Sequence, residues 1–205
     1  MDSAWLLGLS GFAFAMAGTP GPNNTMATAS GIAYGMARTM AFLGGVTFGV
    51  AAITLAVAAF GASVISNPTA ATTLKWAGLA YLLWLAWKIA SADPASLDVP
   101  GEQAPKTRLL GFIQGALVQF INPKLWVMVS GAVVAYGHSG APGTTLTLAV
   151  IFASVLGGMT FVCTLAWAGL GAAIGQRLKS PRSMRAFNIS MAVMLVLSLV
   201  PIVLE

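Results

Sequence analysis

The chain has 205 residues, of which 58% are hydrophobic and only 7% are charged. A soluble domain carries about 25% charged residues, so the composition excludes a soluble globular protein and predicts an integral membrane protein. The formal net charge of +5 does not indicate a nucleic-acid partner, because the basic residues are scattered along the edges of apolar segments. These segments are long and do not alternate with period two, so we expect an all-α membrane protein rather than a β-barrel.

Six transmembrane helices are expected, because about 20 mostly apolar residues are needed to cross the hydrocarbon core of a bilayer. The first and the fourth are longer than one span requires, and each is broken by a proline motif. A re-entrant hairpin is the alternative at either break. The six segments are residues 5–34, 39–64, 73–91, 109–136, 145–173 and 186–204.

The longest polar stretch, residues 92–107, is rich in proline and acidic residues and is typical of a flexible linker. It divides a single membrane domain into a first half, residues 1–91, and a second half, residues 108–205. Each half holds three expected spans. An odd number of spans inverts one half relative to the other, so we expect the 3+3 inverted repeat of many transporters.

The basic residues set the expected orientation, because cytoplasmic loops of membrane proteins carry an excess of Lys and Arg. Eight basic residues fall on one side of the six-helix arrangement, and only Lys75 falls on the other. The first side is therefore expected to be cytoplasmic, with 92–107 as a cytoplasmic linker and both termini outside. The eight residues are Arg38, Lys88, Lys106, Arg108, Arg177, Lys179, Arg182 and Arg185.

The first break combines two prolines, a glycine and two asparagines. Proline stops or kinks a helix, and in lipid a broken helix is tolerated only where the freed backbone groups face protein, water or a ligand. Asn23 or Asn24 is expected to cap the helix that resumes, whose N-terminus suits a carboxylate. A kink that only shapes the bundle is the alternative. The candidate substrate-binding residues here are Pro20, Gly21, Pro22, Asn23 and Asn24.

The second break, at Asn122 and Pro123, places Lys124 in the first turn of a resumed helix, deep in the membrane. This is the wrong helix end for a cation, and a buried lysine is costly in lipid. All five acidic residues lie outside the expected spans. The partners left for Lys124 are carbonyls freed by the first break, water or a substrate carboxylate, and snorkelling to an interface is the alternative. Gln119 and Asn122 are candidates for orienting polar groups.

Three further residues are candidates for the substrate site. Gly45 and Gly49 belong to a glycine series whose spacing favours close helix packing, although these two could also leave room for a substrate. Tyr81 lies in the third expected span, where packing is favoured over a place in a cavity.

The expected spans lack the groups that enzymes need. They contain no acid and no histidine, and the chain has one cysteine, Cys163, which is expected to be a small buried hydrophobe. A metal site, a cofactor and a thiol-redox cycle are therefore not expected. A Ser130–Lys124 pair is separated by six helical positions that point apart. A passive channel is the alternative function.

Both break motifs and the glycine series through Gly49 resemble the LysE/RhtB family of amino-acid exporters. The segment 76–82 resembles the third span of that family, and the continuation 84–89 is similar to the branch that exports cysteine and O-acetylserine. One departure stands out, because many members of the family carry an aspartate directly after the glycine that matches Gly49, and this chain has Val50. That departure argues against a lysine- or arginine-type substrate.

The resemblance implies a secondary transporter that exports a small neutral amino acid across the bacterial inner membrane by alternating access. Its substrate carboxylate is expected between Asn23–Asn24 and Pro123–Lys124. The resemblance implies H+ as the coupling ion and is compatible with a homodimer. Exporters of homoserine, threonine, leucine or lysine remain alternatives.

Overall fold

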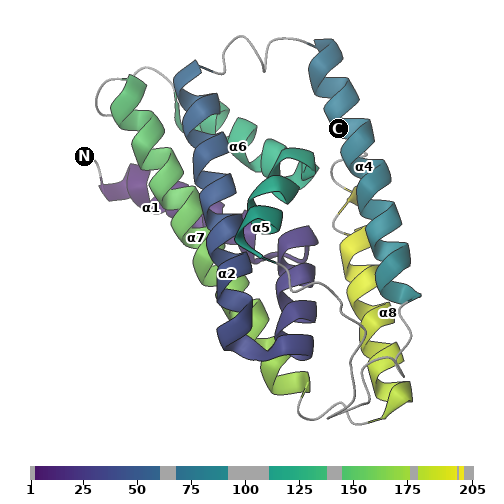
Figure 1. Ribbon diagram of the computed structural model, residues 1–205. Coiled ribbons are helices and arrows are strands. Elements are labelled where there is room, and N and C mark those ends of the chain that lie inside the picture. The colour runs from purple at the N-terminus through teal and green to yellow at the C-terminus, as the bar shows by residue number, and fades with distance from the viewer. Residues whose placement is uncertain are drawn as a thin grey trace.

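The computed structural model describes residues 3–60, 68–91, 111–137, 145–175, 180–197 and 199–200. Every regular element in these residues is helical, which confirms the expected all-α class (Figure 1). The elements are α1 (Ser3–Gly18), α2 (Pro22–Phe60), α4 (Pro68–Ala90), α5 (Phe112–Val118), the 3-10 turn η2 (Gln119–Ile121), α6 (Pro123–Tyr136), α7 (Thr145–Gly175) and α8 (Pro181–Leu197).

The helix α2 is a hairpin of two arms, residues 22–34 and 36–60, joined at Gly35. This glycine has φ 75° and ψ 173°, a conformation that is open essentially to glycine alone. Figure 1 shows the chain reversing direction there. The hydroxyl groups of Ser30 and Thr39 lie 2.9 Å apart across the turn, and Thr39 donates to the Gly35 carbonyl. The first arm covers the end of the first expected span, and the second arm covers residues 39–60 of the second, whose last four residues lie outside the described part of the chain.

The main bundle is held by unusually close approach of α2 and α7. A Cβ atom on Gly31 would lie 2.2 Å from the Ala168 carbonyl oxygen, and one on Gly171 would lie 2.2 Å from the Thr28 carbonyl oxygen. Any side chain at either position would push the two backbones apart, so these glycines allow the contact. Buried side chains of α1, α2, α6 and α7 complete this core.

The helices α4 and α8 pair with each other on one side of the bundle (Figure 1). Their shared core contains Leu79, Ala86, Ala192 and Leu195, and Val127 of α6 packs against it. Both helices begin earlier than expected, at Pro68 and Pro181 rather than near residues 73 and 186. The physical reason is that proline fits the first turn of a helix, where its missing N–H is not needed.

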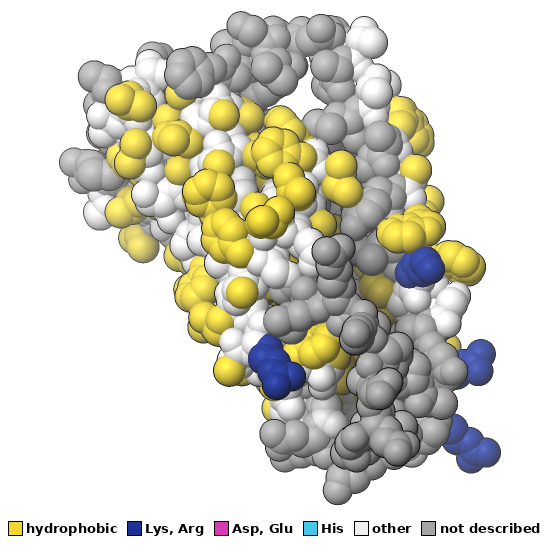
Figure 2. Space-filling model, in the orientation of Figure 1, with side chains coloured by type: hydrophobic (Ala, Val, Ile, Leu, Met, Phe, Trp, Pro, Cys, Tyr) yellow, Lys and Arg dark blue, Asp and Glu magenta, His cyan; other side chains and the backbone are white. Residues whose placement is uncertain are grey.

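The described helices have the surface of a membrane protein. Large apolar side chains point outward, with exposed fractions of 73% for Leu7, 71% for Ile113 and 74% for Val134. Figure 2 shows such side chains spread over the visible face of the bundle. Contiguous exposed apolar surface of this kind marks contact with a membrane or partner.

By length and composition, two described helices could cross a membrane: α7, and α2 when its two arms are counted together across the Gly35 turn. The pair formed by α5–η2 and α6 adds a third candidate, bent by 69° at its break. The helices α1 and α8 have only 16 and 17 residues, and lysines and tryptophans reduce the hydropathy of α4. The number of six spans therefore stays a prediction.

The Lys and Arg side chains visible in Figure 2 lie in the middle and lower parts of the view, and none is visible in the upper part. The exposed residues concerned are Arg38 after the Gly35 turn, Lys88 near the end of α4, and Arg182 and Arg185 at the start of α8. The grouping agrees with the side expected to be cytoplasmic. Lys106, Arg108, Arg177 and Lys179 lie outside the described residues, as do the linker 92–107 and both chain ends.

Candidate functional site

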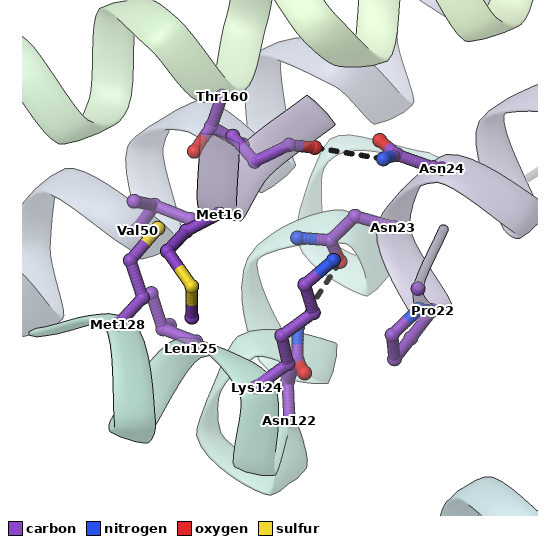
Figure 3. Close-up of a pocket in the computed structure, with 12 residues that line it drawn as sticks. Met16, Pro22, Asn23, Asn24, Val50, Asn122, Lys124, Leu125, Met128 and Thr160 are labelled. Carbon is purple, nitrogen blue, oxygen red and sulfur yellow. Dashed lines mark hydrogen bonds between the residues drawn. The ribbon is translucent and has the colours of Figure 1, made fainter. Parts of the chain in front are cut away.

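The two breaks meet at one cavity near the middle of the bundle. The first separates α1, which ends at Gly18, from α2, which begins at Pro22, and the second separates η2 from α6 at Asn122. The cavity is small, with a volume of about 30 Å³. Its lining, drawn in Figure 3, comprises Met16, Ala17, Gly21, Pro22, Asn23, Asn24, Val50, Asn122, Lys124, Leu125, Met128 and Thr160.

A network of side-chain amides links the two breaks across the bundle. Asn23 and Gln119 form a reciprocal pair. Asn23 Nδ2 donates to Gln119 Oε1, and Gln119 Nε2 donates to Asn23 Oδ1, both at 2.9 Å. Gln119 also donates to the Gly115 carbonyl, and Asn122 donates to the oxygens of Asn23 and Gln119 at 3.4 and 3.3 Å. Gln119 is fully buried. These bonds fix the position of the two breaks relative to each other, because buried amides are costly unless paired.

Lys124 lies between the breaks and contacts the first one directly. Its ammonium donates to the Thr19 carbonyl and hydroxyl, both at 2.7 Å, and to the Pro20 carbonyl at 3.0 Å. Of the expected partners, carbonyls freed by the first break are therefore present. The C-terminal end of a helix carries partial negative charge, so α1 compensates for the unfavourable position of Lys124 at the start of α6.

The expectation that Asn23 or Asn24 caps the resumed helix is wrong. The helix α2 already begins at Pro22, where the Thr25 N–H donates to the Gly21 carbonyl, so both asparagines lie within its first turn. Asn24 instead closes the end of α1, because its Nδ2 donates to the carbonyls of Ala17 and Thr19 at 2.7 and 2.8 Å. Asn24 thus closes the preceding helix rather than capping the next one.

Two helix starts face the cavity with free backbone donors. The first N–H groups of a helix have no carbonyl partner within that helix. In α2 these are the N–H groups of Asn23 and Asn24, since proline has none and Thr25 bonds to Gly21. In α6 it is the N–H of Lys124, since Leu125 bonds to Asn122. Such groups, together with the helix dipole, attract an anion.

Of the remaining expected site residues, Pro20, Gly45, Gly49 and Pro123 do not line the cavity. The Pro20 carbonyl contacts Lys124, and Pro123 is buried at the first position of α6. A Cβ atom on Gly45 would lie 1.9 Å from the Phe112 carbonyl oxygen, and one on Gly49 would lie 2.7 Å from the Gln119 side chain. Both glycines thus accommodate α5. Tyr81 lies in α4, and its side chain lies outside the described part of the chain.

Several cavity residues were not expected from the sequence. Thr160 comes from the middle of α7, and Met16, Leu125 and Met128 form an apolar wall together with Val50 (Figure 3). Thr160 is one of two threonines, with Thr164, in the middle of a long apolar run, so the sequence did not single it out. Within the described residues, no three His, Cys, Asp or Glu side chains come together in a group that could hold a metal ion.

Comparison with known proteins accounts for the arrangement of the two breaks. A family model described as LysE type translocator matches residues 14–202, which include both breaks. The chain belongs to the LysE type translocator family. The resemblance drawn from the break motifs is thereby confirmed, and membership of a translocator family is consistent with the expectation that the chain is not an enzyme.

Relatives of this LysE family chain include two proteins named cysteine/O-acetylserine efflux protein, from Escherichia coli O1:K1 and Escherichia coli K12. They are 34% and 36% identical over 183 residues, which cover 87% of this chain and 87% of each relative. A protein of the same name from Klebsiella pneumoniae is 36% identical over 108 residues, or 52% of each chain. No solved structure matches the chain.

Proposed function

We propose that this LysE family chain is a secondary transporter that exports a small neutral amino acid, with cysteine or O-acetylserine favoured. The observation that carries the proposal is a single cavity lined by both helix starts and by Lys124. The names of the relatives support the substrate class. Exporters of homoserine, threonine, leucine or lysine are the alternatives within the family.

The substrate carboxylate binds where positive charge converges. The N–H groups of Asn23, Asn24 and Lys124 supply donors from two chain segments about 100 residues apart, and the Lys124 ammonium supplies positive charge. The amide network of Asn23, Gln119 and Asn122 holds these donors in place. The apolar wall around Val50 and Met128 receives a small neutral side chain.

Transport requires the cavity to open, because about 30 Å³ is far below the roughly 300–1,000 Å³ of typical ligand pockets. Residues 1–91 and 108–205 form the two inverted halves of a six-span 3+3 repeat, joined by the linker 92–107. Rocking of one half against the other opens the cavity alternately to each side of the membrane. The ammonium of Lys124 and the amide pair Asn23–Gln119 form the contact about which the halves move.

The basic end of the molecule is cytoplasmic, and both termini lie outside, at the periplasmic face of the bacterial inner membrane. A pair of exposed positions at opposite ends tests this orientation. In a Cys163→Ser background, Arg182→Cys at the start of α8 should react with an impermeant maleimide only from the cytoplasmic side. Thr145→Cys at the start of α7 should react only from the periplasmic side. The reverse pattern would invert the proposed orientation.

Counterflow in proteoliposomes tests the transport proposal. Vesicles preloaded with unlabelled amino acid and diluted into labelled cysteine should accumulate label, and a panel of competitors should rank the substrates. Lys124→Met should abolish counterflow while the protein still reaches the membrane. The control is Lys88→Met, because Lys88 lies at the exposed end of α4 over the rings of Trp84 and Trp87, away from the cavity. Unchanged counterflow in Lys124→Met would remove that residue from the mechanism.

The same vesicles distinguish a coupled carrier from a passive channel. An imposed pH gradient should drive uphill accumulation if H+ is the coupling ion, whereas a channel only equilibrates its substrate. Cross-linking in the membrane tests the homodimer, whose formation the transport mechanism does not require.

A further inference from the structure

We propose that the side-chain oxygens of Thr160 and Asn24 bind the α-ammonium group of the exported amino acid. This inference rests on the proposed transport function and adds a third helix, α7, to the substrate site. Its starting point is that both residues line the cavity and that both oxygens are buried without a hydrogen-bond donor.

The described residues contain four buried side-chain oxygens that lack a partner, and three belong to cavity residues. Asn24 and Asn122 are each 2% exposed, and Thr160 is 3% exposed. The fourth, Thr54, does not line the cavity. Buried acceptors are normally paired, so a cluster around one cavity indicates a missing donor rather than three separate defects.

Thr160 and Thr54 lack the hydroxyl hydrogen bond that five other helical threonines make, and of these two Thr160 is the one that lines the cavity. A threonine hydroxyl inside a helix commonly donates to the carbonyl four residues earlier. The hydroxyls of Thr25, Thr28, Thr39, Thr47 and Thr164 all do so, at 2.8–2.9 Å. The Thr160 hydroxyl has no such bond. Its oxygen is therefore available to a ligand.

The orientation of the Asn24 amide is fixed by its neighbours. Its Nδ2 donates to two backbone carbonyls, those of Ala17 and Thr19. A flipped amide would place its oxygen against those carbonyl oxygens and lose both bonds. The Oδ1 atom therefore stays an acceptor, and α1 cannot satisfy it.

A donor with positive charge suits the Asn24 Oδ1 better than an anion does, because an amide oxygen can only accept a hydrogen bond, and the Thr160 oxygen can accept one beside it. An amino-acid ammonium has N–H groups to share among several acceptors. No described helix contains an aspartate or glutamate, so neutral oxygens are the acceptors that the membrane-embedded part of the chain offers.

Charge also decides the side of the cavity on which the ammonium binds. Figure 3 places Thr160 and Asn24 on the upper side of the cavity, and Lys124 and Asn122 on the lower side. The Lys124 ammonium repels a second cation and attracts the carboxylate. The zwitterion therefore binds with its carboxylate toward Lys124 and its ammonium toward α7. Asn122 lies beside Lys124, so we do not assign its oxygen to the ammonium.

The test compares a substrate with its analogue that lacks the amino group. In proteoliposomes under reducing conditions, L-cysteine and 3-mercaptopropionate compete with labelled L-cysteine in counterflow. Thr160→Val keeps the shape of the side chain and removes the hydroxyl. We expect it to weaken inhibition by L-cysteine about 10- to 100-fold, the range for one hydrogen bond to a charged group, and to leave inhibition by 3-mercaptopropionate unchanged.

Two matched variants separate recognition from folding. Thr160→Ser retains the hydroxyl and should restore the preference for L-cysteine. Thr164→Val removes a hydroxyl that is already bonded to the Thr160 carbonyl, and should leave the preference intact. Equal weakening of both inhibitors by Thr160→Val would overturn the inference and indicate a structural role. Sodium-dependent counterflow that is lost in Thr160→Val would also overturn it, in favour of a sodium site.

Counterflow by the unmodified protein distinguishes failure of the ammonium assignment from failure of the proposed transport function. Normal L-cysteine counterflow together with an unaffected Thr160→Val variant would overturn the ammonium assignment alone. Absence of counterflow for every amino acid tested would overturn the proposed function and this inference with it.

Discussion

Gly45 lies where α2 passes closest to α5, and its replacement by alanine tests whether this glycine serves packing or the substrate. A Cβ atom there would lie 1.9 Å from the Phe112 carbonyl oxygen and 2.7 Å from its carbonyl carbon, whereas ordinary van der Waals contact begins at 3.4 Å. The obstructing atoms belong to the backbone. No rotamer change can relieve the overlap, so α5 has to move away from α2.

The expected loss of stability follows from that displacement. Overpacking of a well-packed core costs about 1–3 kcal/mol, and the need for a backbone shift places Gly45→Ala toward the upper end. A chain of this size loses roughly 2–4 °C of melting temperature per kcal/mol, so we expect a decrease of about 4–12 °C. Gly44→Ala is the matched control, because its Cβ would meet only the Phe112 ring, at 3.6 Å.

Thermal unfolding of the purified protein in lipid–detergent micelles measures the effect, and counterflow measures its functional consequence. We expect Gly44→Ala to melt within experimental error of the unmodified protein. Equal melting temperatures for Gly45→Ala and Gly44→Ala would refute the packing argument. A stable Gly45→Ala variant with weakened substrate competition would instead assign Gly45 to the substrate site.

Two further predictions concern the turn and the amide network. Gly35→Ala should destabilise the protein by about 1–3 kcal/mol, because alanine is strained at φ 75° and ψ 173°, whereas Gly158→Ala, in open space on α7, should not lower the melting temperature. A double-mutant cycle of Asn23→Ala and Gln119→Ala should show a coupling energy of about 0.6–1.7 kcal/mol in unfolding, the range for interhelical hydrogen bonds in membranes. Strict additivity would mean that the reciprocal amide pair does not stabilise the contact between the breaks.

The breaks were predictable from sequence because proline acts locally. Pro22 and Pro123 each start a helix at the place where the motif indicates one, and the Gly35 turn falls between the first two expected spans. The role of Asn24 was not predictable in the same way. Its amide reaches backward to α1, and the choice between capping the next helix and closing the previous one depends on the path of the chain between them.

The partners of Lys124 and the place of Thr160 depend on tertiary packing. The sequence shows that Lys124 lacks an acidic partner, but only the meeting of the two breaks shows that Thr19 and Pro20 supply its acceptors. Thr160 belongs to a helix without a break, so no local motif distinguishes it from the apolar residues around it. Only the position of α7 against α2 brings it to the cavity.

The position of Lys124 has a consequence for ion leakage. A pathway through the protein that is polar enough to pass an amino acid would also admit hydrated protons and metal cations, which would dissipate the membrane potential. A fixed positive charge and the positive ends of half-helices exclude such cations from water channels. Here the ammonium of Lys124 and the starts of α2 and α6 surround a cavity of only about 30 Å³. A zwitterion can compensate these charges with its own carboxylate, and a lone cation cannot, so on the proposed function the residues that would receive the substrate would also keep the membrane electrically sealed.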